Sequence, residues 1–196
     1  MFVVVYEILR DSTLPLLDVG CGVGLLAFYL RERGLDHPIT GIDVDARKIQ
    51  RALAAGNSSA GALRFMEANV SDALPSFSGN IAVLDLLHYL SPEHQQRLLE
   101  QLAARVSAGG TLLLRDCPRD GTPRFWATYV GEIFAQTISW NWKTALHFPT
   151  AESIAAAFRG DDFTLEIQKA WGGTPFNNQL FIFRRRESSG AVPATG

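Results

Sequence analysis

The chain has 196 residues, of which 47% are hydrophobic and 19% charged, and its formal net charge at pH 7 is −2. That length allows one domain with a sizeable core. The slightly negative net charge and the absence of a basic stripe in the sequence argue against a nucleic-acid partner. Cys21 and Cys117 are too few for a disulfide framework or a zinc-ribbon site. No apolar run reaches the ~20 residues of a membrane span. We therefore expect a cytoplasmic protein that binds no metal, nucleic acid or membrane.

The first two-thirds of the chain alternate short apolar runs with helical patterns. Strands are expected over 16–19, 39–42, 63–66, 81–86 and 111–114. Helices are expected over 25–33, from the N-cap Asp45 to Leu53, and from the N-cap Ser91 to Gly109. Strands separated by helices of this length pair in parallel through right-handed crossovers. The pattern predicts an α/β, Rossmann-like, doubly wound sheet.

The pattern changes after the fifth expected strand. Helices are expected over 124–148 and 151–158, and strands over 163–170 and 180–183. The loop 171–178 between these strands is short enough for an antiparallel hairpin. The sheet should therefore have seven strands, mostly parallel, with the last one antiparallel. From Glu187 onward Ser, Gly, Pro and Ala dominate, which predicts a domain over 1–186 and a disordered tail over 187–196.

A glycine-rich turn, Asp18-Val19-Gly20-Cys21-Gly22-Val23-Gly24, joins the first strand to the first helix. Glycine allows positive φ and close approach of a ligand to the backbone, and the helix N-terminus presents free N–H groups. A dinucleotide-binding loop would carry its third glycine at position 25, where this chain has Leu25. The turn by itself is also compatible with an ordinary tight connection.

A second signal is Asp43, which follows the next strand in Gly41-Ile42-Asp43-Val44-Asp45, 23 residues after Gly20. An open α/β sheet places a carboxylate here against a ribose diol, and hydrogen bonds to a charged group contribute ~1.5–3 kcal/mol each. The alternative is that Asp43 only caps the following helix, a task for which Asp45 is better placed. Together the two signals predict a ligand that contains adenosine.

These residues carry a resemblance to a known family. The segments 16–24, 41–43 and 84–89 closely resemble the successive motifs of class I S-adenosylmethionine-dependent methyltransferases, over about residues 14–116. The likeness implies an enzyme in which Asp18 and the glycine backbone hold the methionine part of S-adenosylmethionine, Asp43 holds the ribose, and Asn69 faces the adenine amino group. The implied cofactor-binding residues are Asp18, Gly20, Cys21, Gly22, Gly24, Asp43, Val44, Asn69 and Asp85.

Three departures from the family pattern stand out. Asn69 occupies a position where the family often has Asp, so its contact with adenine would lack a charge. Asn80 stands where an Asp usually opens the fourth strand. The segment before the first strand is shorter than the family's helical lid, which predicts a lid that is short or truncated. Either Met1 is a misplaced start, which we favour, or the cofactor pocket is unusually open.

A narrower likeness concerns the acceptor. The segments 25–34 and 171–178 look like those of methyltransferases encoded with bacterial aryl-polyene and related carrier-protein-linked acyl pathways. That likeness implies an aromatic or polyene acyl acceptor bound to a carrier protein; without it, the acceptor is expected to be a small, largely apolar molecule. Neither the acceptor atom nor the oligomeric state follows from the sequence.

Ligands in such sheets bind at the carboxyl ends of the strands, and this edge collects the expected acceptor-binding residues. They are Tyr89, Arg115, Trp171, Phe176, Asn177 and Asn178. All four tryptophans lie in the C-terminal part and could wall an apolar pocket. Packing in the core explains Trp126 and Trp140 equally well, whereas Trp171 falls on a loop.

Methyl transfer needs little covalent help, because the sulfonium is already an activated electrophile. Alignment of the reacting atoms supplies up to ~7–11 kcal/mol, and a general base is needed only if the acceptor must lose a proton. His88 is the first candidate for that base, since an imidazole titrates near neutrality; Asp116 is the second. The alternative for His88 is a hydrogen-bonded structural role.

Two other functions compete with methyl transfer. A nicotinamide-dependent Rossmann oxidoreductase would share the fold class, although the glycine spacing counts against it. A non-catalytic module that binds an adenosine cofactor would share the binding residues, because several family positions are altered and no base is certain.

Overall fold

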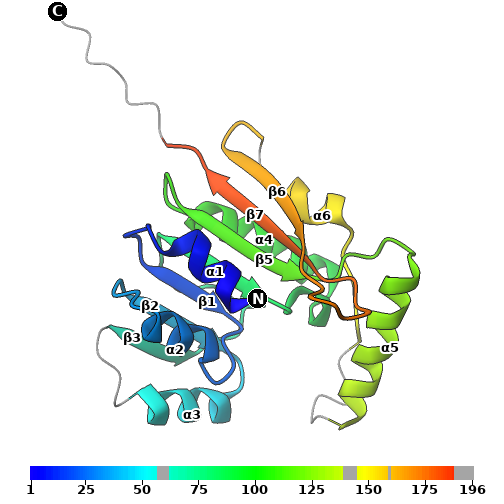
Figure 1. Cartoon of the computed structure of the whole chain (residues 1–196), viewed down its shortest axis with the longest axis horizontal. Coiled ribbons are helices and arrows are strands. Elements are labelled where there is room, and N and C mark those ends of the chain that lie inside the picture. Colours follow the sequence, from blue (N-terminus) through cyan, green and yellow to red (C-terminus); the bar gives the residue numbers. More distant parts are fainter. Residues whose placement is uncertain (57–61, 139–144, 159, 188–196) are drawn as a thin grey trace, which may run out of the picture.

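The computed structural model describes residues 1–56, 62–138, 145–158 and 160–187 (Figure 1). The strands are β1 (Leu16–Val19), β2 (Ile39–Asp43), β3 (Leu63–Glu67), β4 (Asn80–Leu84), β5 (Thr111–Asp116), β6 (Phe163–Lys169) and β7 (Gln179–Arg185). The helices are α1 (Phe2–Leu9), α2 (Leu25–Glu32), α3 (Ala46–Gly56), α4 (Pro92–Arg105), α5 (Pro123–Ile138), α6 (Ala151–Ala156) and the short 3-10 helix η1 (Leu87–Tyr89).

All seven strands belong to one sheet, in the order β3-β2-β1-β4-β5-β7-β6. Neighbours from β3 to β5 pair in parallel, whereas β7 runs antiparallel to both β5 and β6. The predicted fold class is therefore confirmed. The order also differs from that of the dinucleotide-binding sheet, 3-2-1-4-5-6, because β7 is inserted between β5 and β6.

Helices cover both faces of the sheet (Figure 1). On one face α1, α2 and α3 contribute buried side chains such as Val5, Leu30 and Ile49 to a core cluster. On the other face α4 and α6 contribute Leu98 and Ile154 to a second cluster. The residues of β1 are buried throughout, because a central parallel strand is covered on both sides.

The structure corrects one helix that the sequence predicts. Within the expected helix 124–148, the described residues are helical up to Ile138, whereas residues 145–148 have no regular secondary structure. Instead, Leu146 and Phe148 pack against an aromatic cluster with Phe125, and tertiary packing therefore decides the conformation here. Residues 139–144, which include the expected pocket residues Trp140 and Trp142, lie outside the described residues, as does most of the expected tail.

A second difference is α1, which the sequence analysis left unassigned. Val5 and Leu9 lie one helical turn apart, and both are buried on the sheet. The ring centroid of Phe2 lies 5.8 Å from that of Tyr29 on α2, and the two rings are tilted by 46°. The apolar spacing i, i+4 of Val5 and Leu9 was the signal that could have revealed this helix.

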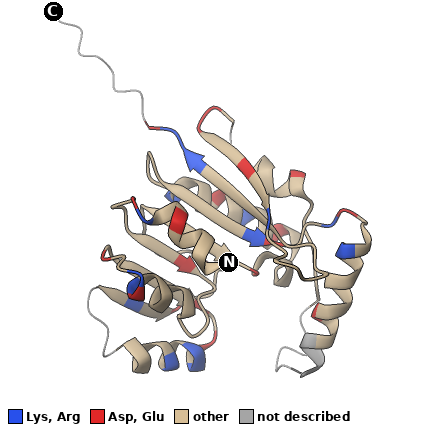
Figure 2. Ribbon diagram, in the orientation of Figure 1, with Lys and Arg blue, Asp and Glu red and all other residues tan. Residues whose placement is uncertain are grey.

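Along the ribbon, Lys and Arg residues are interspersed with Asp and Glu residues (Figure 2). Within the described ranges, no helix combines the length and the apolar character that crossing a membrane requires. The same residues contain no group of His, Cys, Asp and Glu side chains arranged to hold a metal ion.

Asn80 opens β4 and joins three parts of the chain. Its Nδ2 donates to Ser12 Oγ at 2.8 Å, and its Oδ1 accepts a hydrogen bond from the Thr111 backbone N–H at 2.9 Å. The side chain is almost fully buried. A neutral amide, which both donates and accepts, satisfies these partners, and this explains why Asn is suitable at a position where the family usually has Asp.

We therefore expect Asn80→Ala to lower the free energy of unfolding by about 1–3 kcal/mol, since Thr111 N–H would be left buried without a partner. Urea unfolding of the purified variant measures this loss. Ser78→Ala, which removes an exposed hydroxyl contact to Ser107, is the matched control and should change stability by less than ~0.5 kcal/mol. Equal effects of the two substitutions would contradict a structural role for Asn80.

Candidate functional site

The glycine-rich turn adopts a backbone that side chains disfavour. Gly20, Gly22 and Gly24 have φ values of 77°, 57° and 82°. A Cβ atom on Gly24 would lie only 2.7 Å from the buried ring of Phe65. Glycine at this position, the N-cap of α2, therefore lets the start of the helix pack closely against Phe65 of β3.

Asp43 ties this turn to the end of β2. Its Oδ2 accepts a hydrogen bond from Gly22 N–H at 2.9 Å, and its Oδ1 accepts one from Asp45 N–H at 2.9 Å. Asp45 in turn accepts a hydrogen bond from Arg47 N–H at the start of α3. Of the two roles considered for Asp43, the structure assigns helix capping to Asp45 and gives Asp43 a place between the turn and a cavity.

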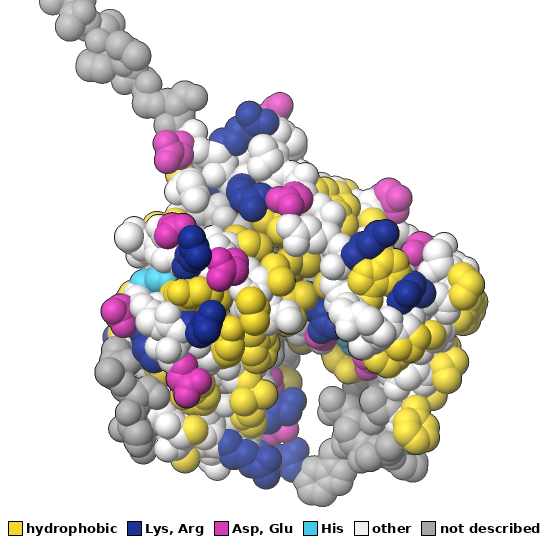
Figure 3. Space-filling view, viewed as in Figure 1, with side chains coloured by type: hydrophobic (Ala, Val, Ile, Leu, Met, Phe, Trp, Pro, Cys, Tyr) yellow, Lys and Arg dark blue, Asp and Glu magenta, His cyan; other side chains and the backbone are white. Residues whose placement is uncertain are grey.

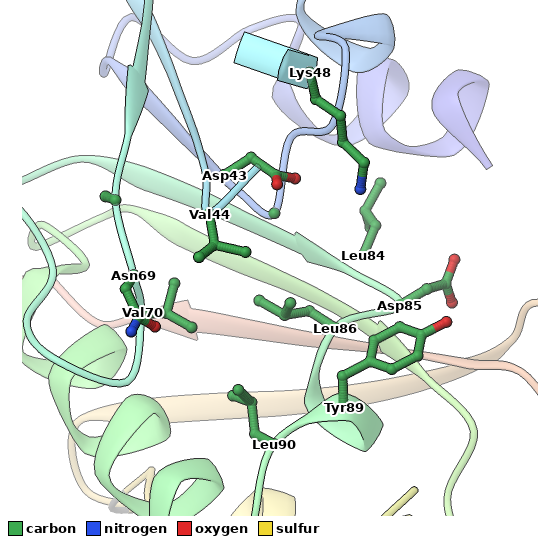
Figure 4. A pocket seen from close by; sticks show the side chains of 12 residues that line it. Asp43, Val44, Lys48, Asn69, Val70, Leu84, Asp85, Leu86, Tyr89 and Leu90 are labelled. Atoms are coloured by element: carbon green, nitrogen blue, oxygen red, sulfur yellow. The ribbon is translucent and has the colours of Figure 1, made fainter. Parts of the chain in front are cut away.

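The first cavity has a volume of about 280 Å³ and lies over the carboxyl ends of β1, β2 and β4 (Figure 4). Among the predicted site residues it is lined by Gly20, Asp43, Val44, Asn69, Asp85 and Tyr89. Asn69 lies on one side and Tyr89 on the other in Figure 4. The Asn69 Oδ1 also accepts a hydrogen bond from Ser71 N–H at 3.0 Å, so the loop after β3 fixes its orientation.

A second cavity, of about 400 Å³, continues from the first. Its lining adds Asp18, Cys21, Gly22 and Arg115, all predicted, together with Phe2 of α1. The two cavities share four lining residues, Gly20, Lys48, Leu84 and Asp85. Figure 3 shows the molecule hollowed between the part that carries α2 and α3 and the part that carries α5.

Asp18 supplies a buried acid at the base of the second cavity. The residue is only 3% exposed, and its Oδ2 has no hydrogen-bond partner among the described residues. Burial above all, together with the nearby carboxylate of Asp43, raises the pKa of Asp18 to about 7. A buried carboxylate without a partner is unfavourable, so this site would be stabilised by a cationic ligand group.

Asp85 and Lys48 place opposite charges where the two cavities meet. Asp85 has φ 57°, an uncommon value for a residue other than glycine, and its carboxylate forms an ion pair with Arg115. Burial raises the pKa of Asp85 to about 6, although Arg115 opposes the shift. Lys48, which sequence analysis missed, extends from α3 toward Leu84 and Asp85 (Figure 4). Side chains tilt toward a helix N-terminus, so a lysine in the first turn of α3 was a detectable signal.

The two predicted catalytic residues are in contact with each other. The Nδ1 atom of His88 lies 2.8 Å from Asp116 Oδ1. Asp116 also accepts hydrogen bonds from the backbone N–H groups of Leu87 and Cys117. Neither His88 nor Asp116 is among the described residues that line the two cavities. Their catalytic role stays a prediction.

The predicted acceptor residues of the hairpin loop lie apart from these cavities. Trp171 and Asn177 line a third cavity, of about 460 Å³, which shares no described residue with the other two. The Arg124 guanidinium stacks 3.9 Å from the Trp171 ring centroid. Phe176 faces Gly131 of α5, and the carbonyl of Asn178 accepts the Ala170 N–H within the hairpin.

Asn177 is fixed by partners within the chain. It is 4% exposed, and its Nδ2 donates to Pro118 O and to Asp120 Oδ2, at 3.1 and 2.8 Å. Its backbone N–H donates to Thr128 Oγ1. The side-chain amide therefore holds the hairpin against the loop that leads into α5.

Part of the chain is similar in sequence to known methyltransferases. Residues 16–110 match the family model described as a methyltransferase domain. Trans-aconitate 2-methyltransferase from Sinorhizobium medicae is 31% identical over 101 residues, which are 52% of this chain and 37% of that protein. An uncharacterized methyltransferase from Mycobacterium bovis is 34% identical over 114 residues, 55% of each chain. The chain thus aligns with roughly a third to a half of the length of these relatives.

The fold is also shared with solved structures. Magnesium protoporphyrin IX methyltransferase from Synechocystis, solved with bound S-adenosylhomocysteine, superposes with a TM-score of 0.69 at 20% identity, over 93% of this chain and 80% of that one. Both the family match and the sheet order agree with the resemblance of the sequence motifs to class I, S-adenosylmethionine-dependent methyltransferases.

We expect Asp43→Ala to weaken binding of S-adenosylhomocysteine by at least ~1.5 kcal/mol, about tenfold, because a charged hydrogen-bond acceptor is lost. Calorimetric titration of the folded variant measures the change. Asp45→Ala, which removes the cap of α3 but not a cavity residue, is the control and should keep its affinity within about threefold. Unchanged affinity in a folded Asp43→Ala would show that Asp43 only supports the backbone.

Proposed function

We propose that this chain transfers the methyl group of S-adenosylmethionine to a small, largely apolar or aromatic acceptor, either free or bound to a carrier protein. The observation that supports this most directly is the buried carboxylate of Asp18 beside the glycine turn, whose Oδ2 finds no hydrogen-bond partner in the part of the chain that the structure describes. The cofactor carries a sulfonium and an ammonium group, and both are cations. An acidic cavity at the carboxyl edge of the sheet is complementary to them.

The residues present fit each part of the cofactor. Asp18 would accept hydrogen bonds from the ammonium group, and Lys48, which lines both cavities, would face the carboxylate. Asp43 keeps acceptor capacity for the ribose diol beyond its two backbone bonds. Val44 and Asn69 line the same cavity on the side assigned to adenine.

When bound, the cofactor supplies a methyl group that is already activated for transfer. The chain's own contribution is to hold, orient and desolvate, and alignment of this kind is worth up to ~7–11 kcal/mol. Tyr89 and Leu90 bring apolar surface to the cavity, which supports an acceptor with an aromatic or aliphatic body. The name of the trans-aconitate relative likewise favours a small-molecule acceptor for this chain.

Calorimetry with S-adenosylhomocysteine and with NAD tests the proposal. We expect micromolar binding of S-adenosylhomocysteine and no measurable binding of NAD. Tighter binding of NAD would favour the oxidoreductase. Methyl transfer from radiolabelled S-adenosylmethionine to a panel of aromatic and acyl acceptors then separates an enzyme from a non-catalytic module, which would bind the cofactor and transfer nothing.

Asp18 gives the cofactor site a measurable proton linkage. With its pKa raised to about 7, Asp18 is partly protonated near neutrality, and an ammonium ligand must favour the ionised form. S-adenosylhomocysteine binding should therefore release protons between about pH 6 and 8, and affinity should fall as the pH is lowered through 7. Calorimetry in phosphate and Tris buffers measures the release.

The matched control for this linkage is Asp18→Asn. The substitution preserves size but cannot ionise, so it should abolish proton release and weaken binding by about tenfold or more. Proton release that persists in the folded Asn variant would mean that another group titrates, and the assignment of the ammonium to Asp18 would then be wrong.

A further inference from the structure

Behind the first cavity, four polar side chains from three elements form one connected network. His88 and Tyr89 come from η1, Asp116 from β5 and Glu132 from α5. The Tyr89 hydroxyl donates a hydrogen bond to Glu132 Oε2 at 3.0 Å. The same carboxylate oxygen lies 3.9 Å from His88 Nε2, and the other ring nitrogen of His88 contacts Asp116 at 2.8 Å. Each ring nitrogen of His88 therefore faces a carboxylate.

This placement favours a protonated His88. The residue is 2% exposed, and Phe148 stacks on its ring at 5.3 Å without bringing any charge. Burial alone would disfavour the imidazolium, but the carboxylates of Asp116, Glu132 and Asp85 outweigh it and raise the pKa of His88. The remaining titratable neighbour, Tyr89, keeps its proton, because burial and Glu132 raise its pKa.

An enclosed imidazole whose two ring nitrogens both face carboxylates is unsuited to accept a proton from an acceptor. Its Nε2 has no hydrogen-bond partner among the described residues and is directed toward Glu132, and His88 does not line either of the joined cavities in the described chain. Tyr89, by contrast, lines the first cavity. The connection from the network to the cavity therefore runs through Glu132 and Tyr89.

We propose that Glu132 is a positioning residue for the cofactor cavity: attracted by a buried, positively charged His88, its carboxylate fixes the Tyr89 side chain over the cavity and so couples the docking of α5 to cofactor binding. This inference rests on the proposed function. It assigns His88 the role of a fixed charge and removes it as the general base.

The other contacts of α5 described below do not involve Tyr89, whose hydroxyl is held by Glu132. Near its start the helix packs through Phe125 and Tyr129 against Phe148. Further along, Val130 is 63% exposed. The Glu132 carboxylate, 26% exposed, reaches back to η1 from this part of the helix, so its loss would release Tyr89 without removing the aromatic contacts.

A double-mutant cycle tests the coupling. Glu132→Gln keeps the size of the side chain but removes its charge, and Tyr89→Phe removes the hydroxyl. Each should weaken binding of S-adenosylhomocysteine by roughly three- to tenfold, less than the loss of a direct charged hydrogen bond, because the bond that is broken orients Tyr89 and does not itself contact the ligand. The double variant should bind no more weakly than the weaker single variant, because both substitutions break the same contact. Val130→Ala, on the exposed side of the same helix, should stay within twofold of the wild type.

NMR titration of His88 supplies a second measurement. If Glu132 had a purely structural role, its substitution would not shift the pH at which His88 titrates. The ring C–H signals are assigned by comparison with His88→Gln. In the wild type they should titrate above the ordinary pKa of ~6.5, and in Glu132→Gln at a lower pH than in the wild type. Val130→Ala should leave the titration unchanged. Titration of wild-type His88 at or below its ordinary pKa, or an unchanged titration in Glu132→Gln, would overturn the inference.

The two measurements separate this inference from the function on which it rests. If the wild type does not bind S-adenosylhomocysteine, the proposed function is wrong, and the coupling to the cofactor site is wrong with it. If the wild type binds and the losses in the double-mutant cycle simply add, or neither single variant weakens binding, the cofactor site stands and only the role of Glu132 is overturned.

Discussion

The site depends on the hydrogen bond between the Asp43 carboxylate and the Gly22 N–H. Parallel pairing of β1 with β2 brings the two strand ends together, and this bond then fixes the glycine turn against β2. The turn sets where α2 begins, and Asp43 simultaneously orders the entry to α3 through Asp45. One buried carboxylate thus determines the relative positions of two helices, and both helices contribute to the walls of the joined cavities.

The charged groups around the cavities differ in how far each is compensated by a partner of opposite charge. Asp18 is buried and its Oδ2 has no hydrogen-bond partner among the described residues, Asp85 is paired with Arg115, and both ring nitrogens of His88 face carboxylates. A cationic ligand group would neutralise the charge of Asp18. The charges of Asp85 and His88 already have partners of opposite sign within the chain. Among the described residues, the uncompensated negative charge is therefore concentrated at Asp18, beside the glycine turn, where it favours a cationic ligand group.

Sequence reasoning reached the sheet and its acidic edge because both follow from local patterns. Short apolar runs define the strands, and Asp18, Asp43 and Asp85 lie at strand ends, where parallel pairing must gather them. Glu132 could not be found in this way. Its partner Tyr89 is 43 residues distant, and their contact depends on how α5 docks. The non-helical path of 145–148 has the same origin, since packing of Phe148 decides it.

The antiparallel insertion of β7 has a consequence for the order in which the chain can fold. Because β7 lies between β5 and β6, β5 keeps an unpaired edge until residues 179–185 have left the ribosome. Open strand edges are prone to pair with other chains, and contacts between segments distant in sequence form slowly. The N-terminal strands can assemble during synthesis. The sheet is complete only when β7 pairs with β5 and β6, after nearly all of the described chain has been synthesised. Chaperone dependence during expression would be expected to fall on this final step.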